Sequence, residues 1–67
     1  MAMTPKAARI NVGLTQSESA KALGISKNTL SGYEKGKTIP KLDIALKMAE
    51  LYRCTLDDII FLPEDCA

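Results

Sequence analysis

Apolar residues recur at helical spacing along most of this 67-residue chain. The longest such stripe lies in residues 41–52, where apolar side chains stand three and four positions apart: Leu42, Ala45, Met48, Ala49 and Tyr52. This spacing places the five residues on one side of a helix and predicts that this side is buried. Ile44 and Leu51 fall off that stripe. No segment shows the strict alternation of a strand, so the pattern predicts an all-α chain.

Two shorter helices are predicted toward the ends of the chain. Thr4 and Pro5 form a cap followed by proline at the first helical position, which predicts a helix over residues 5–12. Ile10 falls on its outer side, and its inward residues are Pro5, Ala8, Arg9 and Val12. Near the C-terminus, Thr55 is followed by acidic residues that suit a helix start. We expect a short fifth helix there, with three apolar residues packing inward: Leu56, Ile59 and Ile60.

The middle of the chain contains two further helix patterns separated by a very short break. Thr15 and Glu18 have the T-x-x-E spacing of a capping box, so a helix should start directly after Thr15. Gly24 suits the left-handed residue that ends a helix, Ser26 can cap the next helix, and Gly36 can end it. The pattern predicts helix, three-residue turn, helix, with these apolar residues facing inward: Ala20, Leu23, Leu30 and Tyr33.

The formal net charge of +1 hides a strong asymmetry along the chain. Residues 1–41 contain seven lysine and arginine residues against two glutamates, whereas residues 42–67 contain two basic residues against six acidic ones. This asymmetry suggests a basic face for a polyanion and an acidic end turned away from it. The length fits one domain over residues 1–67, with residues 1–3 and 64–67 expected to be frayed tails.

The composition disfavours several classes of function. Histidine is absent, and Cys54 and Cys66 have neither the paired spacing of a zinc site nor the number of a disulfide scaffold, so we expect no metal and no cofactor. No nucleophile–base arrangement indicates an enzyme, and no small-molecule ligand is evident. The chain has no apolar run that could span a bilayer and no signal-peptide pattern, so we expect a cytoplasmic protein without membrane association.

The two central helix patterns carry a detailed motif. Residues 15–40 read T-Q-x-x-x-A-x-x-L-G-I-S-x-x-T-L-S-x-Y-E-x-G-x-x-x-P, which resembles the lambda-repressor-like, Cro/CI or XRE family of bacterial and phage regulators. The resemblance implies a five-helix DNA-binding domain with a helix-turn-helix at its second and third helices. It also implies a sequence-specific regulator of transcription, expected to be a repressor, that binds a double-stranded operator as a homodimer. The third helix, at about residues 27–35, is expected to read the major groove.

Specific residues follow from the resemblance and from side-chain chemistry. Lysine can donate to guanine O6 and N7, and asparagine can pair with adenine N6 and N7, so the base contacts are expected at the start of the third helix and one turn later. These residues are Lys27, Asn28, Ser31 and Gly32. Phosphate contacts are expected from polar helix starts and flanking lysines. The phosphate candidates are Thr15, Gln16, Ser17, Thr29, Lys35, Lys37 and Lys41.

Other positions are implied to have structural roles. Arg9 and Glu34 match an arginine and a glutamate that pair across the first and third helices in many members of the family. An apolar patch near the C-terminal end is expected to form the dimer contact: Leu51, Ile60, Phe61 and Leu62. The chain also departs from the family pattern, with Ser19 in place of a core leucine and Arg53 in place of a helix-ending glycine. These departures raise the question of what stabilises the core.

Two alternative functions fit the same fold. An antitoxin of a toxin–antitoxin pair also binds its operator, although only four residues follow Pro63 to form a toxin-binding extension. A protein-interaction module could keep the fold without reading DNA. Acidic or bulky side chains at positions 27, 28 and 31 would favour that module, and the chain has lysine, asparagine and serine there.

Overall fold

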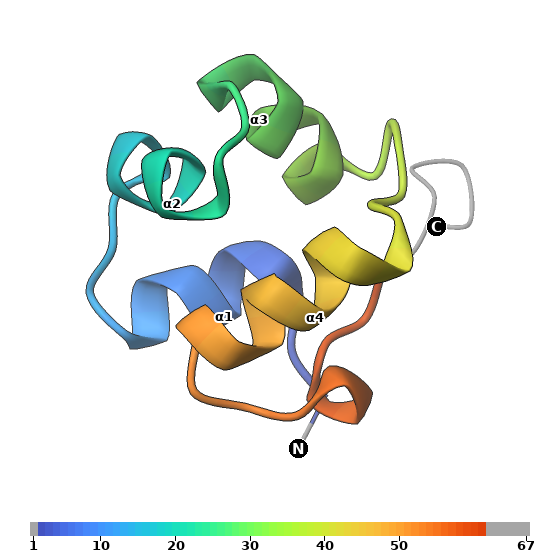
Figure 1. The fold of residues 1–67 in the computed structure, drawn as a ribbon. Coiled ribbons are helices and arrows are strands. Elements are labelled where there is room, and N and C mark those ends of the chain that lie inside the picture. The colour runs from blue at the N-terminus through green and yellow to red at the C-terminus, as the bar shows by residue number, and fades with distance from the viewer. Residues whose placement is uncertain (1, 62–67) are drawn as a thin grey trace.

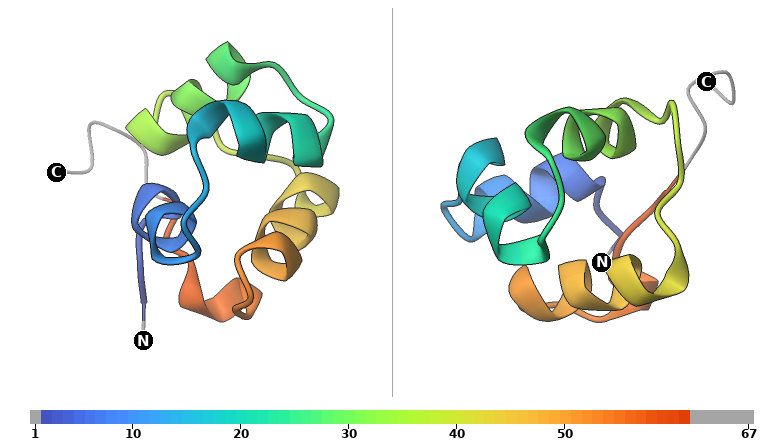
Figure 2. Two further views of the ribbon diagram at one scale, coloured as in Figure 1. Left: turned by 90° about the vertical axis from the view of Figure 1, so that its left-hand side faces the viewer. Right: turned by 45° about the horizontal axis from the view of Figure 1, so that its top comes forward.

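Four α-helices and one short 3-10 turn form the fold of residues 2–61 (Figure 1). The computed structural model describes residues 2–61. Its elements are α1 (Pro5–Asn11), α2 (Gln16–Leu23), α3 (Lys27–Lys35), α4 (Leu42–Leu51) and the 3-10 turn η1 (Leu56–Asp58). The all-α prediction is confirmed for these residues, but the prediction of five helices is wrong, because η1 is a single turn. In Figures 1 and 2, α2 and α3 lie on one side of the molecule, and α1, α4 and η1 lie on the other.

The C-terminal segment leaves the helical conformation because it pairs with the N-terminal segment. Ile59 is extended, with φ −109° and ψ 128°. The Met3 N–H donates to the Asp58 carbonyl at 2.6 Å, and the Ile60 N–H donates to the Met3 carbonyl at 2.8 Å. Met3 is therefore held by two backbone hydrogen bonds, so the expectation of a frayed tail over residues 1–3 is wrong for Met3. Residues 64–67 lie outside the described part of the chain.

Extended backbone also explains which apolar residues are buried after η1. Successive side chains of an extended segment point to opposite sides. Ile59 is buried, Ile60 is 37% exposed and Phe61 packs partly against the core. The prediction that both isoleucines pack inward is therefore wrong for Ile60.

The predicted stripe on α4 is buried except at its first residue. Ala45, Met48, Ala49 and Tyr52 are buried, whereas Leu42 is 64% exposed because it opens the helix one turn before the packed part begins. Two residues predicted to lie off the stripe, Ile44 and Leu51, are half-buried and pack against the core. The buried arc of α4 is therefore wider than the sequence pattern indicates, and it is displaced away from Leu42.

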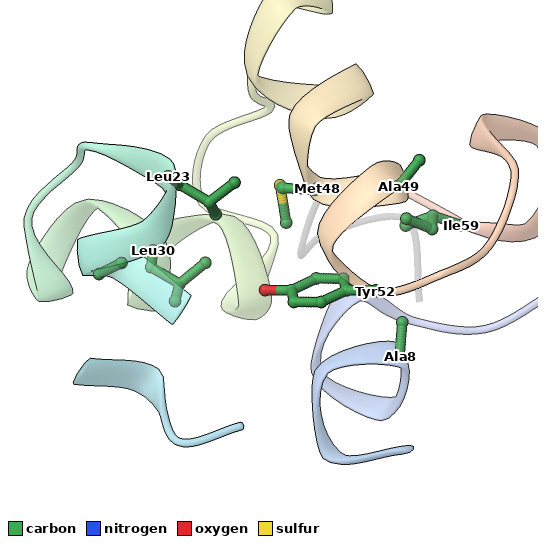
Figure 3. Packing of buried hydrophobic residues seen from close by; sticks show 8 residues of the cluster. Ala8, Leu23, Leu30, Met48, Ala49, Tyr52 and Ile59 are labelled. Atoms are coloured by element: carbon green, nitrogen blue, oxygen red, sulfur yellow. The ribbon is translucent and has the colours of Figure 1, made fainter. Parts of the chain in front are cut away.

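A small apolar cluster joins the four α-helices and Ile59, the residue after η1. Figure 3 shows the Tyr52 ring in the middle of this cluster, between Ala8 of α1 and the side chains of α2, α3 and α4. Leu30 and Met48 are completely buried beside it. The cluster consists of Ala8, Ala20, Leu23, Leu30, Met48, Ala49, Tyr52 and Ile59. One tyrosine thus fills much of the volume that the small alanines leave open.

Candidate nucleic-acid interface

A helix-turn-helix is formed by α2 and α3. Gly24 adopts the left-handed conformation, with φ 72°, and the Ile25 N–H donates to the Ala20 carbonyl at 3.0 Å. A left-handed residue after α2 costs least when it is glycine, so the chain reverses direction within three residues. Gly36 ends α3 in the same way, with φ 76°. The predicted helix, three-residue turn, helix is confirmed.

Side-chain caps begin both helices of this pair. The Thr15 hydroxyl accepts a hydrogen bond from the Glu18 N–H at 3.1 Å, and the Glu18 carboxylate accepts one from the Thr15 N–H at 2.9 Å. Hydrogen bonds from the Thr15 backbone and side chain to the carboxylate lower the pKa of Glu18. At the start of α3, the Ser26 hydroxyl accepts from the Thr29 N–H at 3.0 Å. Both helix starts are therefore determined by local sequence.

A buried polar network holds α3 from behind. Glu34 accepts hydrogen bonds from Arg9 Nε at 2.7 Å and Arg9 Nη2 at 3.3 Å, which makes the ion pair bidentate. The side chains of Arg9 and Glu34 are only 9% and 3% exposed. Arg9 also donates to the Leu14 carbonyl at 2.7 Å, and Gln16 Nε2 donates to Glu34 at 2.9 Å. The network joins α1, the loop before α2, α2 and α3, and it fixes the orientation of α3.

A second buried polar contact replaces the leucine that the family pattern would place at position 19. The hydroxyl groups of Ser19 and Tyr52 form a hydrogen bond inside the core. Ser19 is completely buried, and burial raises the pKa of Tyr52 while the hydrogen bond with Ser19 lowers it. Since Ser19 is one turn after Gln16 on the same helix, α2 is held to α3 and to the end of α4 by polar contacts.

The outer side of α3 carries the predicted base-contacting residues. Lys27, Asn28 and Thr29 are exposed, whereas Ser31 and Gly32 are half-buried. Gly32 lies against the loop before α4: its carbonyl accepts from the Lys37 N–H at 3.0 Å. A Cβ at this glycine would lie 3.3 Å from Thr38 Oγ1. A larger residue at position 32 would therefore require the Thr38 side chain to shift by a few tenths of an ångström.

A shallow hollow brings several predicted phosphate contacts together at the starts of α2 and α3. It is lined by Lys6, Arg9, Thr15, Gln16, Ser17 and Lys27. Lys6 was missed by sequence reasoning. The signal that could have found it is its position one helical turn before Arg9, which places it on the side of α1 that faces α3.

A second hollow lies between α3 and the start of α4. Its lining includes Asn28, Thr29, Gly32, Lys37 and Lys41. The N-terminus of α4 is preceded by Lys41 and has no side-chain cap, unlike those of α1, α2 and α3. Ser31 and Lys35 line neither hollow.

The residues expected at a dimer contact differ in exposure. Leu51 and Phe61 are half-buried and pack partly against the core, and Ile60 is exposed. Leu62 lies outside the described residues. The largest exposed apolar side chains of α4 are instead Leu42 and Leu46.

Residues 2–61 show no features of a metal site or of a membrane-spanning helix. Within residues 2–61, no cluster of histidine, cysteine or acidic residues could hold a metal ion. None of the helices in the described part is long and apolar enough to cross a membrane. Burial raises the pKa of the half-buried Cys54 thiol, and Cys66 lies outside the described residues.

Comparison with known proteins extends the geometric result. Residues 6–59 match the helix-turn-helix family model HTH_3. An uncharacterised HTH-type transcriptional regulator of Methanocaldococcus jannaschii is 40% identical over 52 residues, which cover 78% of this chain and 79% of the relative. The HTH-type transcriptional regulator ImmR of Bacillus subtilis is 40% identical over 55 residues, covering 82% of this chain and 43% of ImmR.

A third relative is named for repression. The cryptic phage CTXphi transcriptional repressor RstR of Vibrio cholerae is 36% identical over 52 residues, covering 78% of this chain and 47% of RstR. The family model covers the described helices except Pro5, the first residue of α1, and the first two relatives share the regulator name. The chain therefore belongs to the Cro/CI-type (XRE) helix-turn-helix family and is a non-enzymatic, DNA-binding regulator of transcription.

Proposed function

We propose that this regulator is a sequence-specific repressor that reads the major groove of double-stranded DNA with α3 and acts as a homodimer on a two-fold symmetric operator. The observation that carries the proposal is the contrast between the two sides of α3. Lys27 and Asn28 are exposed in its first turn, while Glu34 is held from behind by Arg9 and Gln16. A rigid helix with exposed base-reading side chains at its N-terminal end is the arrangement that direct readout requires.

Base reading in this proposal belongs to Lys27, Asn28 and Ser31. Lys27 supplies an ammonium group for guanine, and Asn28 supplies a donor and an acceptor for adenine. Ser31 lies one turn later in α3 and is half-buried. Its short side chain therefore contacts a base only where the base edge lies close to the helix. Gly32 has no side chain, so it can present only its backbone atoms to the groove.

Phosphate contacts in this proposal fall on two sides of α3. On one side, the hollow at the starts of α2 and α3 places Lys6 and Lys27 beside the free N–H groups that follow Thr15. Gln16 keeps one function that the structure shows, the brace to Glu34, and gains a second as a phosphate contact. On the other side, the loop before α4 presents Lys37 and Lys41. The remaining members of the set are Thr15, Ser17, Thr29 and Lys35.

Repression and dimerisation extend the family assignment. RstR is named a transcriptional repressor, and its similarity to this chain covers the helix-turn-helix. A two-fold symmetric operator requires two copies whose α3 helices face the same side of the DNA, one helical turn apart. A bound dimer that covers a promoter represses by excluding other proteins.

Selection of bound duplexes from a random pool tests the proposal and supplies the operator. With that operator, Lys27→Ala and Asn28→Ala should each lower discrimination against random duplex by about 1–3 kcal/mol. Lys37→Ala is the matched control. It should weaken binding to both duplexes about equally and reduce the slope of log affinity against log salt by about 0.9.

Two results would overturn the proposal. The purified protein could fail to bind any duplex even at low ionic strength. Alternatively, the Lys27 and Asn28 variants could lose affinity for operator and random duplex equally, which would assign both residues to phosphates rather than bases.

A further inference from the structure

An apolar pair on the outer side of α4 has no partner in the described part of the chain. Leu42 and Leu46 are 64% and 50% exposed. They stand four residues apart, so they are neighbours on the helix surface and form one strip of apolar surface. Elsewhere on the helix, Ala45, Met48 and Ala49 face the core. Leu42 and Leu46 therefore do not belong to the buried core, and they form exposed apolar surface beside it.

A charged pair runs along one edge of this strip. Asp43 and Lys47 are exposed, and each follows one of the two leucines by a single residue. They are also four residues apart, with opposite charges. The outer side of α4 thus combines an apolar strip with an acid and a base that lie one helical turn from each other.

This arrangement is complementary to itself under two-fold symmetry. A two-fold axis perpendicular to α4 makes the helices of two copies antiparallel and places the same edge of each helix against its copy. Leu42 then faces Leu46 of the second copy, and Asp43 faces Lys47, with both contacts made twice. A parallel arrangement would instead place Asp43 against Asp43. We propose that the strip formed by Leu42 and Leu46, with its edge of Asp43 and Lys47, binds a second copy of this chain.

The direction of that axis also suits a DNA-binding dimer. The edge of α4 that carries the charges faces the helix-turn-helix: Asp43 lines a hollow shared with α3, and Lys47 lines one shared with Ala22 and Leu23 of α2. Figure 1 shows α2 and α3 on that side of α4 and η1 on the other. A two-fold axis running along this direction leaves both copies of α3 on the same side of the dimer.

The contact is small, which determines when it forms. Two partly exposed leucines per copy bury far less than the roughly 1,200–2,000 Å² of a stable specific interface. The contact therefore acts when two copies already occupy neighbouring half-sites, where their effective concentration is high. This step rests on the proposed operator binding, and it predicts cooperative occupation of the two half-sites.

Charge reversal tests the surface with a built-in rescue. Sedimentation of the full chain over a wide concentration range, and binding to duplexes with one or two half-sites, measure self-association with and without DNA. Asp43→Lys and Lys47→Asp should each weaken self-association or cooperativity about tenfold or more, because like charges then face each other. The double variant carrying both reversals should recover the wild-type value to within about threefold, because the two-fold pairs are restored. Leu46→Ser should lose the contact without rescue.

Matched controls separate this inference from the proposed function. Lys21→Asp makes the same charge change on the outer side of α2 and should leave self-association unchanged. Affinity for a single half-site measures DNA reading independently of the contact, and circular dichroism checks that Leu46→Ser is folded. A wild type that is monomeric and binds two half-sites without cooperativity overturns the inference. So does a double reversal that fails to recover, or loss of self-association in Ile60→Ser but not in Leu46→Ser.

Discussion

The same local motif occurs once in each half of the chain and has different results. In the helix-turn-helix, the Glu18 carboxylate accepts from the Thr15 N–H at 2.9 Å, and an eight-residue helix follows. In the C-terminal half, the Asp58 carboxylate accepts from the Thr55 N–H at 3.0 Å, and only a three-residue 3-10 turn follows. A threonine with an acid three residues later therefore begins a turn of helix but does not determine how far the helix runs.

The residues after each motif explain the difference. Thr15 is followed by polar residues and by buried positions at helical spacing, and Gly24 stops the helix. Thr55 is followed by the β-branched Ile59 and Ile60, which favour extended backbone. Met3 supplies the hydrogen-bonding partner that makes the extended conformation favourable. Local sequence determines the helix that follows Thr15, whereas a contact between distant segments determines the extended conformation that follows η1.

The largest expected effect comes from breaking the link between the helix-turn-helix and α1. Glu34→Ala should lower the free energy of unfolding by about 3–5 kcal/mol, because it leaves the Arg9 guanidinium buried without its partner. Urea unfolding followed by circular dichroism measures the loss. Lys35→Ala, at the exposed neighbouring position, is the control and should change stability by less than about 0.5 kcal/mol. A loss below about 1 kcal/mol for Glu34→Ala would show that Arg9 finds water or another acceptor.

The next effect concerns the buried hydrogen bond that ties α2 to the end of α4. Tyr52→Phe and Ser19→Ala should each cost about 1–3 kcal/mol, because each leaves one buried hydroxyl without a partner. The double variant should cost clearly less than the sum of the two, because no polar group is then left unsatisfied. Thermal and urea unfolding of the four proteins complete the cycle. Additive losses would mean that the two hydroxyls do not depend on each other.

Substitutions at the left-handed residues that follow α2 and α4 should change the stability of the protein in opposite directions. Gly24 and Arg53 are both left-handed, with φ 72° and 58°, but only one of them is a glycine. Gly24→Ala should destabilise by about 1 kcal/mol through backbone strain alone, since no atom would meet the added Cβ within 4 Å. Arg53→Gly should stabilise by up to about 1 kcal/mol for the same reason. Shifts of the unfolding midpoint in the same direction would refute this account.

The helix-turn-helix could be predicted from the sequence because its determinants are local. Thr15, Glu18, Gly24 and Ser26 each act within a few residues along the chain. The C-terminal half could not be predicted as well, because the pairing of Met3 with Ile59 joins segments more than fifty residues apart. Periodicity alone also does not show where packing begins, so the exposure of Leu42 was missed.

In the candidate site, too, some features follow from local sequence and others depend on distant contacts. The exposure of Lys27 and Asn28 follows from their place in the first turn after Ser26. Gly32 lies against the Thr38 side chain, which comes from the loop that follows α3 and has no helical spacing to Gly32. Ser19 was expected to weaken the core, and its partner Tyr52 lies thirty-three residues further along the chain. The resemblance to the family implied the distant Arg9–Glu34 pair, whereas no motif in the sequence indicated the Ser19–Tyr52 pair.

The smallest expected effect is a pH dependence that compares the two motifs directly. Hydrogen bonds from the Thr15 N–H and hydroxyl lower the pKa of Glu18 below its ordinary value of 4.5, and those from Thr55 lower the pKa of Asp58 below 3.8. Because both pKa values are lower in the folded state, each carboxylate contributes stability above its ordinary pKa and loses it as the pH falls through the folded value. Glu18→Gln should therefore flatten the decline of Tm that begins below about pH 4.5, and Asp58→Asn should flatten only its more acidic part. Glu18 is exposed and Asp58 is only half-buried, so these shifts should be smaller than any change above. If Glu18→Gln left the pH profile of Tm unchanged, the capping box would stabilise α2 without its charge.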